Sequence, residues 1–190
     1  MCSLLRNKYR VESCRLKDHD YSSVSKYFIT ICIHSKELWF GYILNHQMIL
    51  SESGIIADQI WHELPEHFSY VTLDEFVVMP NHVHGIIIMD PCADNDIGPL
   101  HATGVETLHA TSLRQPPPTK NGFMASISPK PGSLATIIRS YKSAVSKNVH
   151  KQNPDFSWQP RYYDHLIRSN NELDRIRKYI IDNPINWSPY

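Results

Sequence analysis

Two histidines stand two residues apart in the segment Met79–Ile88, whose sequence is MPNHVHGIII. The apolar, β-branched character of this segment favours a strand, and residues two apart on a strand point to the same face. His82 and His84 would therefore present two imidazoles side by side. Two imidazoles can begin a divalent metal site, with Mn²⁺ or Zn²⁺ suited to such ligands. The alternative is a pair of ordinary half-exposed histidines, although histidines within an apolar strand need polar partners.

A tyrosine and an asparagine form the second candidate, within RIRKYIIDNPINW near the C-terminus. Tyr179 and Asn183 are four residues apart and would share one face of a helix, about 6 Å from each other. The apolar stripe of that helix consists of Leu173, Ile176 and Ile180, so Tyr179 lies on its flank and can reach the edge of a sheet. The structural alternatives are a boundary aromatic for Tyr179 and a helix C-cap for Asn183.

The elements that must position these residues begin with a strand at Tyr27–Ile33, followed by extended chain at Leu38–Ile43 and Gln47–Leu50. Ser51 can cap a helix that runs to about Leu64, and its predicted apolar side consists of Ile55, Ile56, Ile60 and Leu64. Two further strands are expected at Val71–Met79 and His82–Met89. Only Pro80 and Asn81 separate them, which indicates a tight turn or a bulge.

The C-terminal part predicts a helix, a strand and a helix. Ser133 can cap the first helix, whose apolar positions have helical spacing: Leu134, Ile137, Ile138, Tyr141, Val145 and Val149. Arg161–Arg168 is the predicted strand, with Tyr163 and His165 on one side. A capping box at Ser169–Glu172 starts the last helix, which ends near Asn183 because Pro184 follows. The order predicts an α+β fold, an antiparallel sheet with helices packed on it.

The segment Asp90–Gly132 differs from the rest in composition. It holds seven prolines and repeats LHAT at Leu100–Thr103 and Leu108–Thr111, with no visible periodicity. These features indicate a long, flexible surface insertion. The chain after it is too small to fold alone, so we expect one domain over residues 1–190, with the flexible Pro-rich insertion at 90–132.

Composition limits the class of protein. A chain of 190 residues with 42% hydrophobic content suits one globular domain. No apolar run is long enough to span a bilayer and residues 1–10 lack a signal-peptide pattern, so the expected location is the cytoplasm and the four cysteines are expected to be thiols. The net charge is zero, yet from Lys120 onward eleven Lys and Arg face five Asp and Glu. This asymmetry indicates a basic face for nucleic acid, unless it is a chance imbalance.

The ordered set MPNHVHGIII, WQPRYYDHLIR and RIRKYIIDNPINW resembles the REP-associated tyrosine transposases, which are relatives of the single-tyrosine HUH transposases of insertion sequences. DYSSVSKYFITICI and GSLATIIRSYKSAVSK are also similar to that family. The resemblance covers most of the chain outside the Asp90–Gly132 insertion, which is the main departure from the family and leaves the choice of target open.

The resemblance implies a ferredoxin-like fold, in which the HUH strand lies beside a C-terminal tyrosine helix. It implies a metal-dependent single-stranded DNA endonuclease and strand transferase that acts through a 5′-phosphotyrosine intermediate. His82, His84 and Asn183 would be the metal ligands and Tyr179 the nucleophile. The family's ion is Mg²⁺ or Mn²⁺. The implied partner is single-stranded DNA with hairpin-containing repeats, bound by a monomer or a homodimer without a membrane.

The expected DNA contacts are basic and aromatic residues of the C-terminal part, because cations track phosphates and exposed tyrosines stack on bases. The set consists of Arg139, Lys142, Arg161, Tyr163, Arg168, Arg175 and Lys178.

Two other functions fit parts of this pattern. A non-catalytic single-strand nucleic-acid binder would use tyrosines and arginines on the same kind of sheet, and would need neither a metal nor Tyr179. A metal-dependent hydrolase would use His82 and His84 with water as the nucleophile, and would need the metal but not Tyr179.

We predict that the Asp90–Gly132 insertion is dispensable for folding, because its prolines and its lack of periodicity indicate few core contacts. A variant with a short Gly/Ser linker in its place should remain soluble and unfold cooperatively in a thermal melt followed by circular dichroism. An unfolded variant would instead mean that the insertion packs on the domain.

Overall fold

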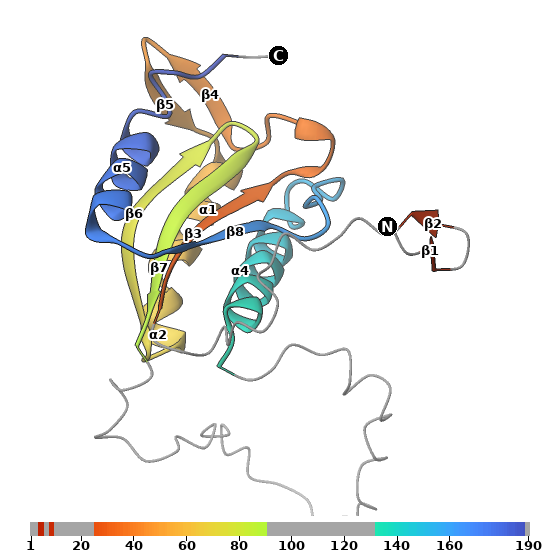
Figure 1. The fold of residues 1–190 in the computed structure, drawn as a ribbon. Helices are drawn as coiled ribbons and strands as arrows, with labels where there is room; N and C mark the ends of the chain where they lie inside the picture. The colour runs from red at the N-terminus through yellow and green to blue at the C-terminus, as the bar shows by residue number, and fades with distance from the viewer. Residues whose placement is uncertain (1–3, 6–7, 10–24, 91–131, 189–190) are drawn as a thin grey trace, which may run out of the picture.

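The centre of the molecule is a four-stranded antiparallel sheet with the strand order β6-β7-β3-β8 (Figure 1). The computed structural model describes residues 4–5, 8–9, 25–90 and 132–188. The sheet strands are β3 (Ser25–Cys32), β6 (Val71–Met79), β7 (His82–Met89) and β8 (Tyr163–Ile167). Two short pairs, β1 (Leu4–Leu5) with β2 (Lys8–Tyr9) and β4 (Gly41–Leu44) with β5 (Gln47–Leu50), form separate ladders, and η1 (His34–Lys36) is a single 3₁₀ turn.

The connections make the sheet ferredoxin-like. Helix α1 (Glu52–His62), extended by the short α2 (Leu64–His67), joins β3 to β6, and α4 (Leu134–Val149) precedes β8. The resulting β-α-β-β-α-β order, with β3 and β7 in the centre, is the split βαβ arrangement. The predicted α+β fold with an antiparallel sheet and packed helices is therefore confirmed. The β6–β7 connection is a tight turn at Pro80 and Asn81, as expected.

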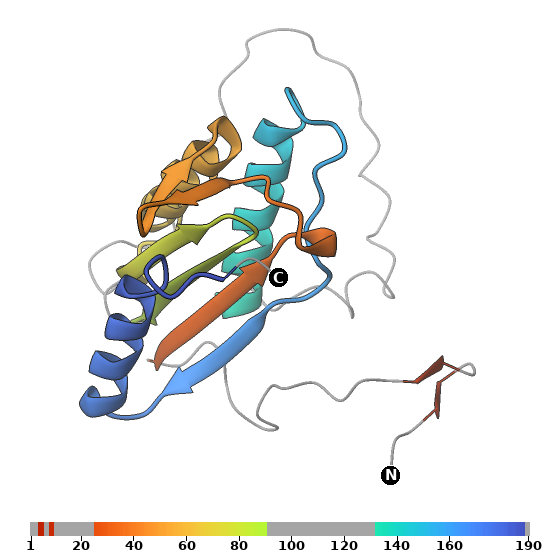
Figure 2. The ribbon, with the colours of Figure 1, turned by 90° about the horizontal axis from the view of Figure 1, so that it is seen from above.

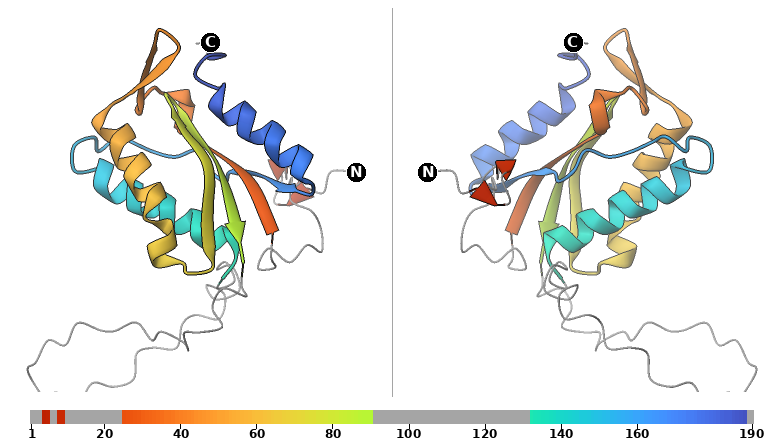
Figure 3. Two further views of the ribbon diagram at one scale, coloured as in Figure 1. Left: turned by 90° about the vertical axis from the view of Figure 1, so that its left-hand side faces the viewer. Right: turned by 90° about the vertical axis from the view of Figure 1, so that its right-hand side faces the viewer.

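One face of the sheet carries α1 and α4, and this side holds the larger core (Figure 3). Alternate residues of β3 point into it, namely Tyr27, Ile29 and Ile31, which are fully buried. The six apolar positions predicted for α4 are all buried. Burial of one whole side of each helix against β-branched strand residues is the main apolar contribution to the fold.

The apolar side predicted for α1 was wrong in part. Ile55 is 44% exposed, whereas Ala57 and Trp61 are buried. The reason lies in the sheet, since the Trp61 ring stacks on Phe76 at 4.5 Å and occupies the space above Gly85. A Cβ atom at Gly85 would lie 2.3 Å from the Trp61 ring, so the glycine after the two histidines makes room for this indole. Compared with the prediction, α1 is rotated about its axis so that Ala57 and Trp61, and not Ile55, face the sheet.

Helix α5 (Asn170–Ile181) packs on the opposite face of the sheet (Figure 3). Its predicted stripe forms a second, smaller core in which Leu173 and Ile180 are buried beside Ile86 and Ile167, with Ile176 partly buried. The predicted cap at Ser169 is present, because its Oγ accepts a hydrogen bond from Glu172 N at 3.2 Å.

An ion pair fastens α5 to the edge strand β6. The Arg177 guanidinium donates from Nε to Asp74 Oδ1 at 2.9 Å and from Nη2 to Oδ2 at 2.7 Å. The hydrogen bonds from Arg177 hold the pKa of Asp74 below its ordinary value of 3.8. This bidentate geometry fixes the rotation of the helix on the sheet as well as its position.

Two sequence predictions concern segments that lie wholly or partly outside the described residues. Residues 91–131 of the Pro-rich insertion at 90–132 lie outside them, as does the start of DYSSVSKYFITICI before Ser25. The assignment of residues 1–190 to one domain therefore stays a prediction.

We predict that Asp74→Asn lowers the free energy of unfolding by about 1–2 kcal/mol, because it removes a charge-assisted bidentate contact whose arginine is partly exposed to solvent. The pKa of Asp74 is lowered in the folded state, so its contribution is present above the ordinary pKa of 3.8 and is lost as the pH falls through the folded value. Urea unfolding of both proteins should be measured between pH 7 and pH 3. The difference between their free energies of unfolding should be constant over most of this range and should shrink at the acid end.

Asp174→Asn is the matched control for this prediction. Asp174 contacts the same Arg177 at 3.2 Å, but its side chain is 68% exposed. Its effect should be below about 0.5 kcal/mol. Equal effects of the two substitutions would mean that Asp74 does not anchor the helix.

Candidate metal and nucleophile site

His82 and His84 lie at the start of β7 and point to the face that carries α5. Their Nε2 atoms are 3.0 Å apart, which confirms the predicted shared face. His84 is 5% exposed and His82 is half-buried. The lone pairs of two buried imidazole nitrogens at this distance repel each other unless a hydrogen atom or a cation lies between them.

The outer nitrogen of each imidazole has a polar partner. The Nδ1 of His82 lies 2.7 Å from Asn81 Oδ1, and the amide nitrogen of Asn81 donates to Lys36 O at 3.3 Å. Because the Asn81 oxygen can only accept, His82 Nδ1 carries the hydrogen and Nε2 keeps its lone pair. The Nδ1 of His84 lies 2.8 Å from Thr30 Oγ1, a hydroxyl that can donate or accept.

Both imidazoles are neutral near pH 7. Burial lowers the pKa of His82 from 6.5 to about 4. Burial and, secondarily, the charge of His82 lower the pKa of His84 to about 3. Neutral imidazole is the form of histidine that binds metals.

The pair meets the geometric requirement for a shared ion. Two nitrogens that bind the same ion at about 2.0–2.1 Å cannot be more than about 4 Å apart. The two Nε2 atoms are 3.0 Å apart. A hydrogen bond from Nδ1 to a carbonyl oxygen, as from His82 to Asn81, is a typical support of a metal-binding histidine. Within the described ranges, no cluster of three or more His, Cys, Asp or Glu side chains could hold a metal, so a third ligand drawn from those ranges would have to be of another type.

Tyr179 brings its hydroxyl to this pair from α5. Its Oη lies 3.4 Å from His84 Nε2, and its side chain is 51% exposed. The tyrosine therefore lies on the flank of the apolar stripe, as predicted, with its oxygen beside the histidines and its ring open to solvent.

A phenylalanine of β3 links the groups of the site. The Phe28 ring stacks on His84, with centroids 5.3 Å apart and planes 28° apart. Its ring also meets Tyr179 edge-on at 6.0 Å and Tyr163 edge-on at 6.3 Å. One half-buried ring thus holds an imidazole and two tyrosines in place.

Asn183 lies just beyond α5 instead of inside it. The helix ends at Ile181, and the Asn183 backbone N–H donates to Ile180 O at 3.3 Å. Among the described residues, its amide forms no hydrogen bond with either imidazole. The chain around it is nevertheless held near the pair, because Trp187 lies 5.8 Å from the His82 ring.

The β4–β5 hairpin supports this C-terminal segment from its turn (Figure 1). Asn45 and His46 both have positive φ values, 49° and 63°, which suits a type I′ turn. His46 Nδ1 lies 3.3 Å from Ile185 O, so the hairpin contacts the segment that carries Asn183.

Some of the predicted DNA contacts gather around Tyr179. Tyr163 and Arg175 line one cavity of about 320 Å³ with Tyr179, and Arg161 lines a neighbouring cavity of about 240 Å³ that Tyr163 also borders. Lys178 is exposed on α5 beside the tyrosine.

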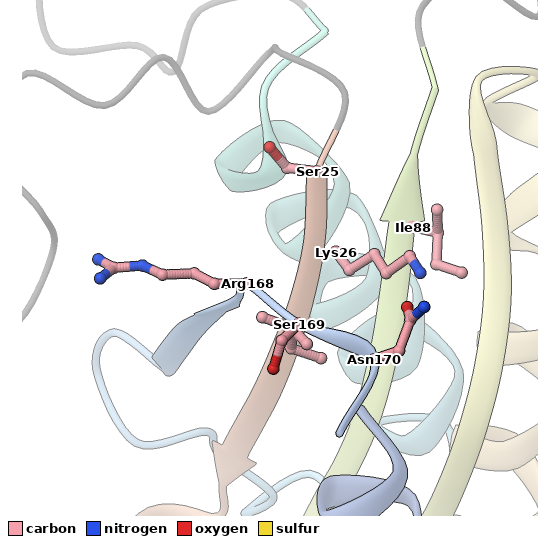
Figure 4. Close-up of a pocket in the computed structure, with 7 residues that line it drawn as sticks. Ser25, Lys26, Ile88, Arg168, Ser169 and Asn170 are labelled. Carbon is pink, nitrogen blue, oxygen red and sulfur yellow. The ribbon is translucent and has the colours of Figure 1, made fainter. Parts of the chain in front are cut away.

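The remaining predicted contacts lie elsewhere. Arg139 and Lys142 are on α4, which covers the other face of the sheet, and Lys142 Nζ donates to Gln159 O and Arg161 O at 2.8 and 3.0 Å. Arg168 lines a third cavity at the start of α5, but its side chain points away from Lys26 and Asn170 (Figure 4). The seven expected contacts therefore do not form one patch.

Sequence reasoning missed four residues that the structure places against the candidate ligands, namely Phe28, Thr30, Asn81 and Trp187. Asn81 stands in the same motif as the histidines, and this adjacency was a usable signal. Phe28 and Thr30 carry no such signal, because only the pairing of β3 with β7 sets Thr30 opposite His84.

Two solved structures align with this chain at low sequence identity. A REP-associated tyrosine transposase bound to a REP hairpin aligns with a TM-score of 0.53 and 14% identity, over 90% of this chain and 73% of that one. A proposed transposase from Deinococcus radiodurans aligns with a TM-score of 0.44 and 12% identity, over 90% of this chain and 97% of that one. The first alignment shows a shared fold. Within the described part of the chain, no helix could cross a bilayer.

Sequence comparison identifies a relative but not its activity. No protein-family model matches the chain. An uncharacterized protein of Haemophilus influenzae is 38% identical over 177 residues, which cover 92% of this chain and 88% of that protein. Identity at this level over nearly the full length of both proteins means that this chain belongs to the same family as the uncharacterized Haemophilus influenzae protein.

Proposed function

We propose that this protein is a transposase-type, metal-dependent endonuclease and strand transferase of single-stranded DNA. Tyr179 is its nucleophile, and His82 and His84 are ligands of a divalent ion. The observation that carries the proposal is the meeting of three groups, since Tyr179 Oη lies 3.4 Å from His84 Nε2, which lies 3.0 Å from His82 Nε2.

The chemistry suits these side chains. The Tyr179 oxygen attacks the phosphorus, the bond to the 3′ oxygen breaks, and a 5′-phosphotyrosine forms. The proton that the phenol loses is balanced by the proton that the 3′-OH fragment gains. The phosphoester energy is retained in the tyrosine link, so a 3′-OH can later attack it and restore the phenol without ATP.

The divalent ion, when bound, would polarise the scissile phosphate as a Lewis acid. Two neutral imidazoles would leave the ion its full positive charge, which favours an anionic substrate. Asn183 is the proposed third ligand, because it lies on the segment between Tyr179 and Trp187, whose rings contact His84 and His82. Mg²⁺ or Mn²⁺ is the proposed ion.

The surroundings of the other tyrosines favour Tyr179 as the nucleophile. Tyr141 is fully buried and donates its hydroxyl to Ala57 O at 3.1 Å, and burial raises its pKa well above the ordinary value. Tyr162 packs against the larger core, on the other face of the sheet. Tyr163 is exposed and remains the one rival on the α5 side among the tyrosines considered.

The first test concerns the metal. His82→Ala combined with His84→Ala should abolish Mn²⁺ binding in calorimetry and metal-dependent cleavage, while binding of single-stranded DNA is largely kept because it depends on phosphate contacts elsewhere.

Single variants test the supporting residues. Asn81→Ala should weaken Mn²⁺ binding about 10–100-fold by releasing the His82 ring, and Asn183→Ala should have a milder effect because water can replace one neutral ligand. Asn148→Ala on α4 is the matched control. Unchanged Mn²⁺ affinity in the double variant would refute the metal assignment.

The second test concerns the nucleophile. Tyr179→Phe keeps the ring that packs on Phe28 but removes the attacking oxygen, so the variant should fold, bind Mn²⁺ and bind single-stranded DNA, yet form no covalent adduct. Mass spectrometry of the denatured wild-type reaction should find a 5′-phosphate joined to Tyr179. Tyr42→Phe, at an exposed tyrosine of β4, should behave as the wild type.

Other results would point to other functions. Cleavage by Tyr179→Phe without an adduct at any tyrosine would favour the hydrolase. Tight DNA binding with no cleavage by the wild type in Mg²⁺ or Mn²⁺ would favour the non-catalytic binder.

A further inference from the structure

We propose that the two cavities bordered by Tyr163 hold neighbouring nucleotides of the single strand, with the Tyr163 ring as a base-stacking platform between them. This inference rests on the proposed function, because it assigns the path of the strand next to the scissile phosphate. Arg175 at one end and Arg161 at the other would pair with backbone phosphates.

The sheet register places Tyr163 in line with the candidate metal site. His84 of β7 is the partner of Thr30 on β3, and Thr30 is the partner of Tyr163 on β8. These three residues form one row across the sheet. Strands lie about 4.8 Å apart, so the Cα of Tyr163 is about 10 Å from that of His84. A ring at this distance is within reach of the nucleotides adjacent to the scissile phosphate.

The Tyr163 ring is exposed yet held in place. Its side chain is 48% exposed, and its ring meets the Phe28 ring edge-on at 6.3 Å. The same Phe28 ring meets Tyr179 at 6.0 Å, so the stacking surface and the proposed nucleophile rest on one support. An exposed aromatic ring with a fixed position is what sequence-tolerant base stacking requires.

The larger cavity lies between Tyr163 and Tyr179. It has a volume of about 320 Å³, with Phe28 and Ile176 as apolar walls and Arg175 as its cation. The smaller cavity, of about 240 Å³, is also bordered by Tyr163, together with Thr30, Pro160 and Arg161. Apolar walls beside a ring favour a base, and the two guanidinium groups favour the flanking phosphates.

The charges near the larger cavity permit an anionic strand. Its one carboxylate, Glu172, accepts from Arg168 N and lies 2.8 Å from His165 Nε2. The Arg168 backbone N–H is the first cause of the lowered pKa of Glu172, followed by His165, and Arg175 also contributes. The carboxylate is thus engaged at both oxygens. In the described part of the chain, Arg161 and Arg175 form no salt bridge of their own.

The test maps bound DNA without requiring cleavage. Tyr179→Phe is mixed with a 5-iodouracil oligonucleotide of about 12 nucleotides, irradiated, digested and analysed by mass spectrometry. We expect crosslinks on the peptide that contains Tyr163. Crosslinks confined to α4 peptides, or to the peptide of the control residue Tyr42, would overturn the proposal.

Affinity measurements in the same Tyr179→Phe background give the second readout. Tyr163→Ala should weaken binding of a single-stranded oligonucleotide about 5- to 150-fold, and Tyr163→Phe should restore it, because stacking needs the ring and not the hydroxyl. Arg161→Ala and Arg175→Ala should each reduce the slope of log K against log salt by about 0.7, whereas Arg139→Ala should not. Unchanged affinity of a folded Tyr163→Ala would refute the platform.

The two proposals fail in different ways. An adduct at Tyr179 together with normal binding by Tyr163→Ala would leave the nuclease and reject the platform. Crosslinks at Tyr163 without any adduct in the wild type would leave the platform and reject the nuclease.

Discussion

The attachment of α5 to the sheet is the constraint on which the candidate site depends. The helix carries Tyr179, while the histidines stand on β7, so only this packing brings phenol and imidazoles together. Leu173 and Ile180 supply the apolar part, and the Asp74–Arg177 ion pair adds a directional contact that resists rotation of the helix about its axis. A rotation by one residue, about 100°, would turn the Tyr179 hydroxyl away from His84.

The two faces of the sheet differ in what covers them. The face under α1 and α4 is filled mainly with apolar side chains, and the buried Tyr141 hydroxyl there donates to Ala57 O. Of the helices in the described residues, α5 is the one that packs on the other face (Figure 2), and the described residues cover that face only in part. The uncovered part exposes Thr30, Tyr163 and the tyrosine edge of the helix beside the histidine pair. This part of the face, over β3 and β8, is where the proposed DNA strand would lie.

The histidine pair is supported from outside the sheet as well. The turn at Pro80 and Asn81 is held by the segment after β3, through Ile33 N to Asn81 O at 2.8 Å and Phe40 N to Pro80 O at 3.0 Å. Asn81 then fixes the His82 ring through its side chain. If the pair binds an ion as proposed, this prior orientation reduces the conformational freedom lost on binding.

The sequence by itself determined the elements, because periodicity and caps are local properties of the chain. The spacing of Leu134 to Val149 and the Ser169 cap predicted helices that the structure contains, and the His-x-His pattern predicted a shared strand face. No residue pattern predicted which elements meet. Only the family resemblance implied that the histidine strand lies beside the tyrosine helix, and the tertiary structure decided the contacts. Packing of Trp61 over Gly85 overrode the apolar side expected for α1, and the β7–β3–β8 register aligned His84, Thr30 and Tyr163, which are far apart in sequence. The meeting of Tyr179 with the histidines, the roles of Phe28 and Thr30, and the dispersal of the basic residues depend on contacts between distant segments. A pattern within one segment does not predict such contacts, because they join segments that come together only when the chain folds.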